Sequence, residues 1–525
     1  MNMKLFFALT IGPIYKTMGL ARHTKEIWMS SYFFSYLMEK ICEALKDKGE
    51  LIIPNTNIDY SACQAGLYPD RLIMSYQPKK DIVKDITQII HDSVKKVADD
   101  FFTTKEDKDF FKKYILVHHT FIQLNDKDNP VDVIFPILES MEQRPTYVEN
   151  YEMNKHAVYN LLKDPGRVDR YVKIFNSKSI PTLKDIAECE CNTENPANRK
   201  YHNYLAYVQA DGDGIGKLLH ILYETGGEEA LQKLSRFLFD FGSQAATEII
   251  EFGGKPIYMG GDDMLFIAPV KYNNKTIFNL IDQLDRKFWD NIRENDDLQE
   301  CISKWNSSIT RDNKREPVHT GISFSVFVAY HKYPMKESLL SVREQLFYKA
   351  KSIPGKNSVY FTMLKHSGQC IETFWNKNNV DRGSYCFFLE ILEKEAPLYD
   401  SVFLTSIQYK FKPLEPLISR ILVGRKVDPG IAAFDDALYE NLPNEEQRVL
   451  FFNNLTENFF NELVHDKEKK SFIKNSFNYL LNVYRELEDK YGNNSATAVM
   501  AINNLYAVLR FIQFINQKGN QEENF

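Results

Sequence analysis

The sequence is poor in cysteine, and this shortage argues against two kinds of protein. The seven cysteines among 525 residues are scattered and odd in number, which favours a reducing compartment over a disulfide framework. Only Cys189 and Cys191 lie close together. Because a four-cysteine zinc site needs a second close pair, we expect no bound zinc.

An excess of positive charge and a long apolar run are also missing. Lys and Arg total 65 against 71 Asp and Glu, a formal net charge of −6, so the whole surface is not a nucleic-acid-binding field, although local patches remain compatible. The apolar run 5–11 is short and ends at Gly12-Pro13, which predicts a buried strand and not a signal peptide. No stretch approaches the roughly 18–20 apolar residues that span a bilayer. We therefore expect a cytoplasmic protein with no membrane partner.

The residues that are present predict a folded protein of several domains. Hydrophobic residues make up 44% of the chain and aromatic residues 13%, which is typical of globular proteins. A chain of this length exceeds a single hydrophobic core, so three or four domains are expected.

Hydrophobic periodicity predicts the same order of elements twice. The first part reads strand, helix, strand, strand, helix, strand, at 3–11, 28–45, 51–54, 71–75, 81–101 and 114–124. The second part repeats this order at 204–210, 228–252, 256–259, 264–268, 277–293 and 321–329, followed by a helix at 336–352. This order is ferredoxin-like and indicates an internal duplication.

These patterns predict an α+β protein of four parts. We expect a first palm-like (ferredoxin-like) domain at 1–125, a mixed, partly helical insert at 126–199, a second palm domain at 200–365 and an all-helical C-terminal domain at 366–525.

Carboxylates at one edge of the second predicted sheet are the candidate catalytic residues. Asp211 ends an apolar strand, and Asp262 and Asp263 follow two glycines in a predicted hairpin turn beside that strand. Glycines at 260 and 261 permit positive φ and a close approach of phosphate. Clustered carboxylates repel one another unless a cation lies among them, and Mg²⁺ or Mn²⁺ prefers such oxygen ligands. Taken alone, Gly-Gly-Asp-Asp also suits a solvated turn.

Basic residues downstream are candidates for binding the phosphates of a nucleotide. Lys351 lies at the end of a predicted helix, and Lys356 follows in Pro354-Gly355-Lys356-Asn357. Their charge would balance a triphosphate, although cations also stabilise the end of a helix through its dipole.

At these residues the chain resembles the palm (GGDEF-like) domains of the large subunit of type III CRISPR effector complexes, particularly the III-B or Cmr kind. The second palm carries the resemblance in Gln209-Ala210-Asp211-Gly212-Asp213-Gly214-Ile215-Gly216-Lys217, Tyr258-Met259-Gly260-Gly261-Asp262-Asp263 and Ala329-Tyr330-His331-Lys332-Tyr333-Pro334. The first palm carries it in Ile11-Gly12-Pro13, in the segment 21–32 and in Gly66-Leu67-Tyr68-Pro69-Asp70-Arg71.

The resemblance implies two palms that face each other with nucleotides between them. ATP would be polymerised into a second messenger when target RNA is bound, within a ribonucleoprotein of guide RNA, target RNA and other subunits. Asp211 and Asp263 would bind the metal, with Asp262 assisting. Further nucleotide-binding positions would be Gly212, Asp213, Gly260, Gly261, Lys351, Lys356, Ser30 and Ser31.

The chain departs from the family pattern in two places. Many relatives begin with an HD-type nuclease domain, whereas here the first palm starts at residue 3, and His91-Asp92 lies inside a predicted helix. We therefore expect no DNase activity. The cysteine-rich zinc module is reduced to Cys189 and Cys191, and His118-His119 on an apolar strand fits a packed or hydrogen-bonded role better than metal binding.

Three functional alternatives stay open. The product of an RNA-activated nucleotidyltransferase would be cyclic oligoadenylate, or AMP joined to S-adenosylmethionine, which some relatives without the nuclease make. A second alternative is a non-catalytic scaffold that binds RNA and small subunits. The third is a stand-alone nucleotide cyclase of the GGDEF type.

Overall fold

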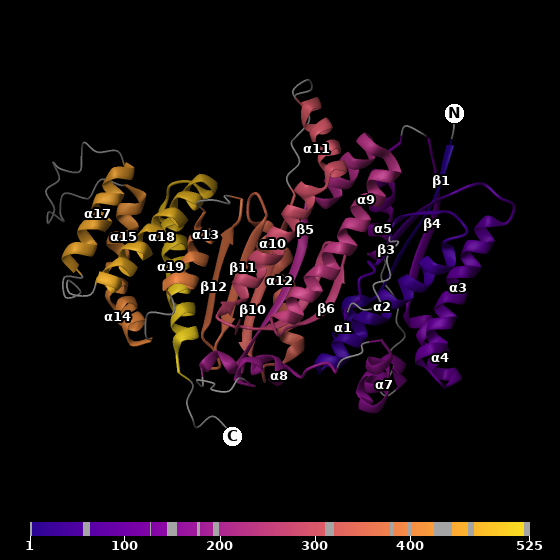
Figure 1. Cartoon of the computed structure of the whole chain (residues 1–525), viewed down its shortest axis with the longest axis horizontal. Coiled ribbons are helices and arrows are strands. Elements are labelled where there is room, and N and C mark those ends of the chain that lie inside the picture. Colours follow the sequence, from indigo (N-terminus) through magenta and orange to yellow (C-terminus); the bar gives the residue numbers. More distant parts are fainter. Residues whose placement is uncertain are drawn as a thin grey trace.

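The structure of the chain is a computed structural model. It describes residues 3–55, 64–125, 128–143, 155–175, 179–192, 199–309, 320–378, 383–395, 401–424, 444–459 and 467–518. The molecule is elongated, with the first domain at one end, a second sheet in the middle and C-terminal helices at the other end (Figure 1).

The first domain is built on an antiparallel sheet with the strand order β2-β3-β1-β4. Its elements are β1 (Met3–Gly12), α1 (Ile14–Met18), α2 (Thr24–Leu45), β2 (Glu50–Ile53), β3 (Arg71–Tyr76), α3 (Ile82–Phe101), α4 (Lys105–Tyr114) and β4 (Leu116–Asn125). Both their order and their arrangement are ferredoxin-like, as predicted. β1 reads as a continuous apolar run because both of its faces are covered: Phe7 packs with α2 and α3, and Phe6 packs with the second domain.

The second domain repeats this arrangement and extends it. Its sheet has the order β12-β11-β10-β5-β7-β6, in which β10-β5-β7-β6 matches the order of the first sheet. The strands are β5 (Tyr204–Asp213), β6 (Lys255–Gly260), β7 (Asp263–Pro269), β10 (Gly321–Tyr330), β11 (Ser358–Leu364) and β12 (Cys370–Asn376). The connecting helices are α9 (Ile215–Glu251), α10 (Ile277–Glu294), α11 (Asp296–Ile309) and α12 (Met335–Tyr348), and a short hairpin pairs β8 (Lys271–Tyr272) with β9 (Lys275–Thr276).

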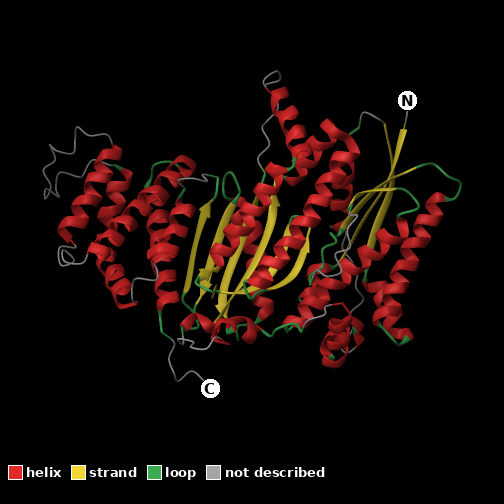
Figure 2. Ribbon diagram, viewed as in Figure 1, coloured by secondary structure: helices red, strands yellow, loops and turns green. Residues whose placement is uncertain are grey.

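Each domain covers part of the other, which confirms that the two palms face each other. α9 of the second domain packs against β2, and α2 of the first domain packs against β6 of the second sheet. Figure 2 shows helices around and between the two sheets. Tyr258 of β6 also forms a parallel bridge with Gly66 of the first domain, and Met259 N donates to Gly66 O at 3.0 Å. The shared core fixes the edge of each sheet relative to the other domain.

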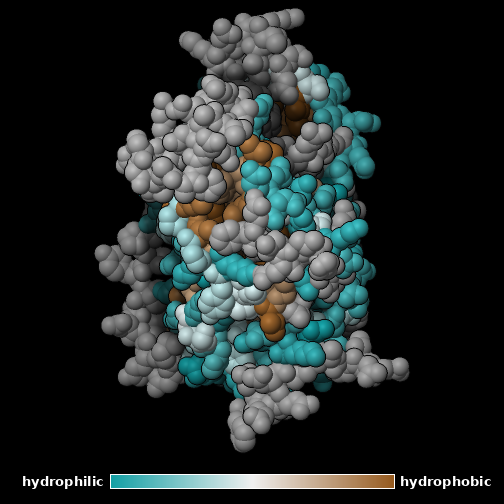
Figure 3. All heavy atoms as spheres, turned by 90° about the vertical axis from the view of Figure 1, so that its left-hand side faces the viewer, coloured by the Kyte–Doolittle hydropathy of each residue, from teal (hydrophilic) through white to brown (hydrophobic). Residues whose placement is uncertain are grey.

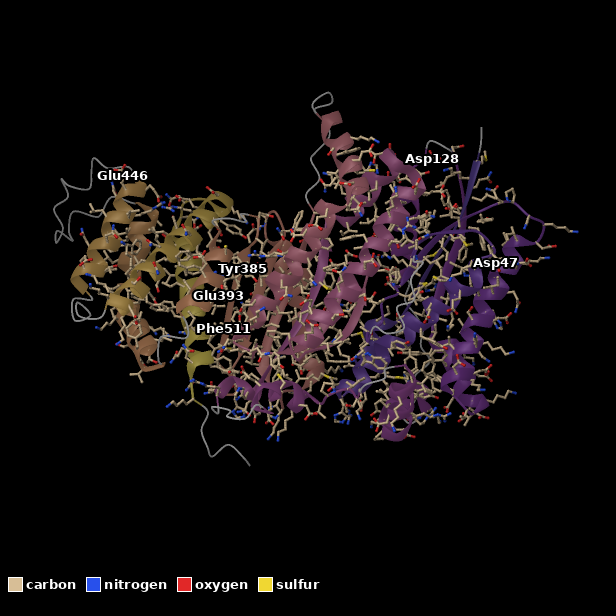
Figure 4. The ribbon with its side chains drawn as sticks, in the orientation of Figure 1. Asp47, Asp128, Tyr385, Glu393, Glu446 and Phe511 are labelled. Carbon is tan, nitrogen blue, oxygen red and sulfur yellow. The ribbon has the colours of Figure 1, made fainter. Side chains whose placement is uncertain are left out.

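Helices occupy both the insert and the C-terminal region. The insert contains α5 (Pro130–Glu142), α6 (Ala157–Lys163), α7 (Pro165–Phe175) and α8 (Leu183–Ala187). The C-terminal region contains α13 (Ser384–Glu390), α14 (Ser401–Phe411), α15 (Glu415–Val423), α17 (Asn444–Phe459), α18 (Lys467–Tyr491) and α19 (Ser495–Asn516). Figure 4 places Tyr385 of α13 and Phe511 of α19 where these helices meet the sheet, and Phe511 packs against Phe361 of β11.

The structure differs from the sequence analysis at three elements. α9 begins at Ile215, ahead of the expected start at residue 228, and contains a break at Gly227 (φ +65°). The insert is more helical than expected, and α5 packs on β1 and β4 of the first domain. β12 lies beyond residue 365, where only helices were expected, because Ile371, Thr373 and Trp375 alternate toward the core.

Among the residues that the structure describes, one helix is apolar enough to cross a membrane by length and composition, which the sequence analysis did not expect. This helix is α19, and 67% of its most apolar window is buried inside the protein. A core helix passes the same test, and Phe511, Ile512 and Phe514 of α19 are part of the main core. Figure 3 looks onto the end formed by the C-terminal helices, where hydrophilic and hydrophobic residues both reach the surface.

Candidate active site

The predicted acidic residues meet at the edge where β5 and the β6–β7 hairpin lie side by side. β5 pairs with β7 up to Ala210 opposite Met264, so Asp211 and Asp263 follow directly at the end of this ladder. Gly260 pairs with Asp263, which leaves Gly261 and Asp262 as the two residues of the turn. Gly261 adopts a φ of +71°, the conformation that the first residue of a type II′ hairpin turn requires.

Glycine is also required at 212, for a different reason. A Cβ added to Gly212 would lie 2.6 Å from Oδ2 of Asp262. The Asp262 carboxylate therefore rests against the backbone of β5 and accepts a hydrogen bond from it at Gly212. Burial raises the pKa of Asp262, and the backbone hydrogen bonds oppose that rise. A side chain at 212 would push the turn away from β5.

Asp263 is held by a residue of the first domain. Tyr15 of α1 donates its hydroxyl proton to Oδ2 of Asp263 at 2.9 Å, and Gln209 Nε2 donates to the same hydroxyl at 3.1 Å. The Arg343 guanidinium stacks over the Tyr15 ring, 3.6 Å from its centre. Oδ1 of Asp263 is buried and accepts no hydrogen bond from a described residue. Burial raises the pKa of Asp263 to about 7, and the charges of Asp262 and Asp70 add to the rise.

Asp211 is paired with the predicted phosphate-binding lysine. Lys351 forms an ion pair with the Asp211 carboxylate and donates to Gly212 O at 3.1 Å. Burial, with a contribution from the nearby charge of Lys356, lowers the pKa of Lys351 to about 8. Lys356 itself is exposed, with a φ of +48°. Both lysines therefore lie near the acidic edge, as the sequence predicts, and their binding of phosphate stays a prediction.

Asp213 anchors the loop that carries these lysines. Its Oδ2 accepts hydrogen bonds from Ser323 Oγ at 2.6 Å and from Asn357 N at 2.9 Å, and the residue is 4% exposed. Burial raises its pKa, and these hydrogen bonds lower it. Direct contact with a nucleotide, as the resemblance implied for Asp213, does not fit such burial.

The two serines of the first domain do not reach this site. Ser30 and Ser31 are fully buried within α2, and Ser30 Oγ donates to Ile27 O at 2.8 Å. They were expected to face the nucleotides, and the structure corrects this expectation. Their helical positions turn them into the packed side of α2 and away from solvent.

A cavity of about 390 Å³ lies at this edge, between the two domains. The carboxylates Asp211, Asp262 and Asp263 form part of its wall, together with Gly260 and Gly261. The first domain contributes Tyr15 and Asp70, and burial raises the pKa of Asp70 to about 6. Arg71, Glu139, Ser235 and Tyr258 also line it, and the remaining side chains are apolar, among them Ile14, Met18, Ile53, Phe135, Ile215, Leu219, Leu234, Leu238, Phe239 and Leu265.

Sequence reasoning missed the residues that the first domain contributes to this cavity, among them Tyr15 and Asp70. Tyr15 and Asp70 belong to the first domain, far from the acidic motif along the chain, and no local pattern marks either as functional. The one available signal was their position inside or directly beside the segments that carry the family resemblance, after Gly12-Pro13 and in Pro69-Asp70-Arg71.

The donor set of this cavity suits a hard divalent cation. Its donors are carboxylate oxygens, and the buried Oδ1 of Asp263 lacks a hydrogen-bond partner among the described residues. No three His, Cys, Asp or Glu side chains within the described ranges are gathered as a metal cluster. Lys351 and Tyr15 take up oxygens of Asp211 and Asp263 that a cation would otherwise share. We conclude that the residues fit a metal, provided that Lys351 and Tyr15 give up these contacts.

The histidines and cysteines set aside earlier lie elsewhere. His119 packs against Phe7 and Phe121 in the first sheet, and burial lowers its pKa. His91 is on the exposed side of α3. Cys189 lies beside Gly253, and the side chain of Cys191 is outside the described part of the chain, so the expectation about zinc stays a prediction.

Two regions of the chain match known protein families. Residues 204–360 match the model of the Cas10/Cmr2 second palm domain, and residues 6–99 match that of the CRISPR-associated protein Cmr2, N-terminal. A curated relative, the CRISPR system Cmr subunit Cmr2 of Pyrococcus furiosus, is 26% identical over 135 residues, which are 26% of this chain and 13% of that relative.

A solved structure shows the same fold. The apo state of a type III-B Cmr-beta complex contains a chain with a TM-score of 0.50 and 11% identity, and the match covers 84% of this chain and 80% of that chain. A Csm1-Csm4 cassette in complex with cA4 matches at a TM-score of 0.46 and 10% identity, over 98% of this chain and 70% of that chain. The chain therefore carries an N-terminal region and a second palm domain of the Cas10/Cmr2 family of type III CRISPR proteins.

Proposed function

We propose that the chain is a nucleotidyltransferase that converts ATP into a nucleotide second messenger, as a subunit of a type III CRISPR ribonucleoprotein with guide and target RNA. The observation that carries this proposal is the position of Asp211, Asp262 and Asp263 in the wall of one cavity between two palm domains. A 3′-oxygen of one nucleotide would attack the α-phosphorus of another, and the bond to pyrophosphate would break.

The residues of the cavity have separate roles in this proposal. Asp211 and Asp263 would hold Mg²⁺ or Mn²⁺, with Asp262 assisting from the turn, and the metal would stabilise charge on the phosphoryl oxygens. Lys351 forms an ion pair with Asp211 in the structure. When a nucleotide binds, its ammonium group would leave Asp211 and pair with the triphosphate. Gly260 and Gly261 add no side chain to the cavity wall, and the apolar walls would accept a base.

Two products are compatible with this site. Cyclic oligoadenylate uses ATP alone, whereas AMP joined to S-adenosylmethionine needs that second substrate. The residues of the cavity do not favour one product over the other.

The test is turnover of α-labelled ATP by the assembled complex with target RNA and Mg²⁺ or Mn²⁺, with and without S-adenosylmethionine. We expect a new labelled product and release of pyrophosphate from the wild type. Asp263→Ala should abolish the product and leave assembly intact, because Ala removes a proposed metal ligand and adds no bulk to the cavity wall. Asp47→Ala is the matched control: it removes a carboxylate from an exposed site of the first domain (Figure 4).

If ATP stays unchanged in every wild-type mixture, the proposal is refuted, and the result supports a non-catalytic scaffold role for the chain. Turnover of GTP alone would instead support a cyclase of the GGDEF type. Loss of assembly together with activity in Asp263→Ala would show that the Asp263 carboxylate supports the docking of the two domains through Tyr15 and would contradict a role limited to metal binding.

A further inference from the structure

A second cleft lies at the opposite edge of the second sheet, where β12 meets the C-terminal helices. It encloses about 750 Å³. Its walls come from the β11–β12 turn, from β12 and from α14, α15 and α19. No residue of this cleft lines the acidic site, so the two sites are separate.

Basic side chains in this cleft have no acidic partner. Lys365, Lys412 and Arg510 line it, and none of them forms an ion pair with a carboxylate within the described ranges. Lys365 is half-buried, and its pKa is lowered by burial and by the neighbouring charges of Lys200 and Arg510. Cations that repel one another at a partly buried site are stabilised by a bound anion.

The acidic residues of the cleft do not neutralise these cations. Glu372 is already engaged by Lys349 Nζ at 3.0 Å and by the Tyr360 hydroxyl at 2.9 Å. Glu415 is the other carboxylate among the lining residues. Three cations against two carboxylates, one of which is already paired with Lys349, give the cleft a local positive charge in a chain whose formal net charge is −6.

The cations are held in place by ordered backbone. Lys365 begins a tight turn in which its N–H donates to Gln369 O at 2.9 Å and its carbonyl accepts from Gly368 N at 2.8 Å. Arg510 lies on α19 with its guanidinium over the ring of Tyr506, 5.8 Å from the ring centre. A fixed arrangement of cations can select a ligand with more than one negative group.

Aromatic and amide side chains complete the cleft. Tyr409 of α14 is 74% exposed, an unusual position for a large ring, and Gln369 and Asn503 offer amides. Cations along a groove, with exposed rings on which bases stack, are the recurring features of sites for single-stranded nucleic acid. The carboxylates of an acidic peptide would pair with the cations but would not stack on the Tyr409 ring. The exposed ring therefore favours a nucleic acid as the ligand.

We propose that this cleft binds a single-stranded nucleic acid, with Lys365 and Arg510 on its phosphates and Tyr409 stacked on a base. The proposal names a contact surface for RNA that neither the sequence nor the family likeness indicates.

The test is fluorescence anisotropy of the full chain with a labelled single-stranded RNA of about ten nucleotides over a series of KCl concentrations. Each phosphate contact contributes about −0.7 to the slope of log K against log salt for single strands. The double variant Lys365→Gln/Arg510→Gln should therefore flatten the slope by about 1.4 and weaken binding. Tyr409→Ala should weaken binding by about tenfold with an unchanged slope, because stacking releases no counterions.

Matched variants separate this site from general charge and from the acidic cavity. Lys96→Gln removes the same charge from the exposed side of α3, at the other end of the molecule (Figure 1), and should change neither affinity nor slope. Lys365→Arg should keep the slope, and Asp263→Ala should bind RNA as the wild type does. Circular dichroism before and after heating checks that each variant is folded.

Three results would overturn the proposal. One is RNA binding that is equal in the wild type, the double variant and Tyr409→Ala. Another is no RNA binding by the wild type at low salt. The third is complete displacement of the RNA by AMP or by a poly-glutamate peptide, which would indicate a mononucleotide site or an unspecific anion site.

Discussion

At the residue scale, Asp263 links the two domains through a hydrogen bond. Its carboxylate lies at the start of β7, yet its hydrogen-bond donor, Tyr15, belongs to the first domain. Burial raises the pKa of Asp263 to about 7, and the Tyr15 hydroxyl opposes that rise by stabilising the ionised form. The charge of a proposed metal ligand thus depends on contact between the domains.

Tyr15→Phe should move the pH dependence of ATP turnover. The metal has to displace the proton of Asp263, whose pKa without metal is about 7, so at limiting Mg²⁺ the acid limb of the wild-type profile should rise near pH 7. Loss of a hydrogen bond to a charged group raises the pKa by about one unit, and the limb should shift upward by that amount. Tyr114→Phe is the control: its hydroxyl bonds Thr17 of the same helix α1, 2.7 Å away, and does not touch Asp263. An equal shift in both variants would contradict the role of Tyr15.

Asp263→Asn should stabilise the metal-free protein increasingly as the pH rises. The pKa of Asp263 is about 7 in the folded state and about 3.8 in the unfolded state. Between pH 3.8 and pH 7 the folded state therefore holds a proton that the unfolded state has lost. The stability that this proton contributes is lost as the pH rises through about 7. Asn has no such proton to lose, so between pH 5 and pH 8 its advantage in the free energy of unfolding should grow by roughly 3 kcal/mol, at about 1.4 kcal/mol per pKa unit. Thermal melts from pH 5 to pH 8 with chelator measure it; a difference in melting temperature that is constant with pH would refute it.

At the scale of elements, the β6–β7 hairpin depends on glycine in the neighbouring strand. Gly212→Ala places a Cβ 2.6 Å from Asp262 Oδ2, which should shift the turn and lower turnover by at least about tenfold, because small displacements at a reacting centre are costly. Gly216→Ala lies four residues further along the chain and meets no atom within 4 Å, so it should retain activity. Similar turnover in the two variants would show that the turn tolerates the shift.

Elements with strong periodicity could be predicted from the sequence, and elements fixed by distant contacts could not. The strands β5, β6 and β7 and the Gly-Gly-Asp-Asp turn follow from alternation and turn chemistry. The first part of α9 was missed because Gly226 and Gly227 resemble the end of a loop. β12 was missed because an edge strand is short and its far neighbour, α19, lies more than a hundred residues later.

At the scale of the whole molecule, the site exists because two domains of the same fold cover each other. The sequence analysis placed Asp211, Asp262 and Asp263 together correctly, since one sheet edge positions all three. It could not place Tyr15 or Asp70, because their approach depends on how α1 and β3 dock on the second sheet. It misplaced Ser30 and Ser31 because a sequence motif does not say which side of α2 packs inward.

The central claim is that the acidic edge between the domains binds divalent metal and a nucleoside triphosphate. The most direct measurement is anomalous scattering from crystals of the chain grown with Mn²⁺ and a non-hydrolysable ATP analogue. The account predicts manganese peaks in contact with the Asp211 and Asp263 carboxylates, with Lys351 moved from Asp211 to the triphosphate. An edge without manganese at saturating metal and nucleotide, or manganese bound only elsewhere, would contradict it.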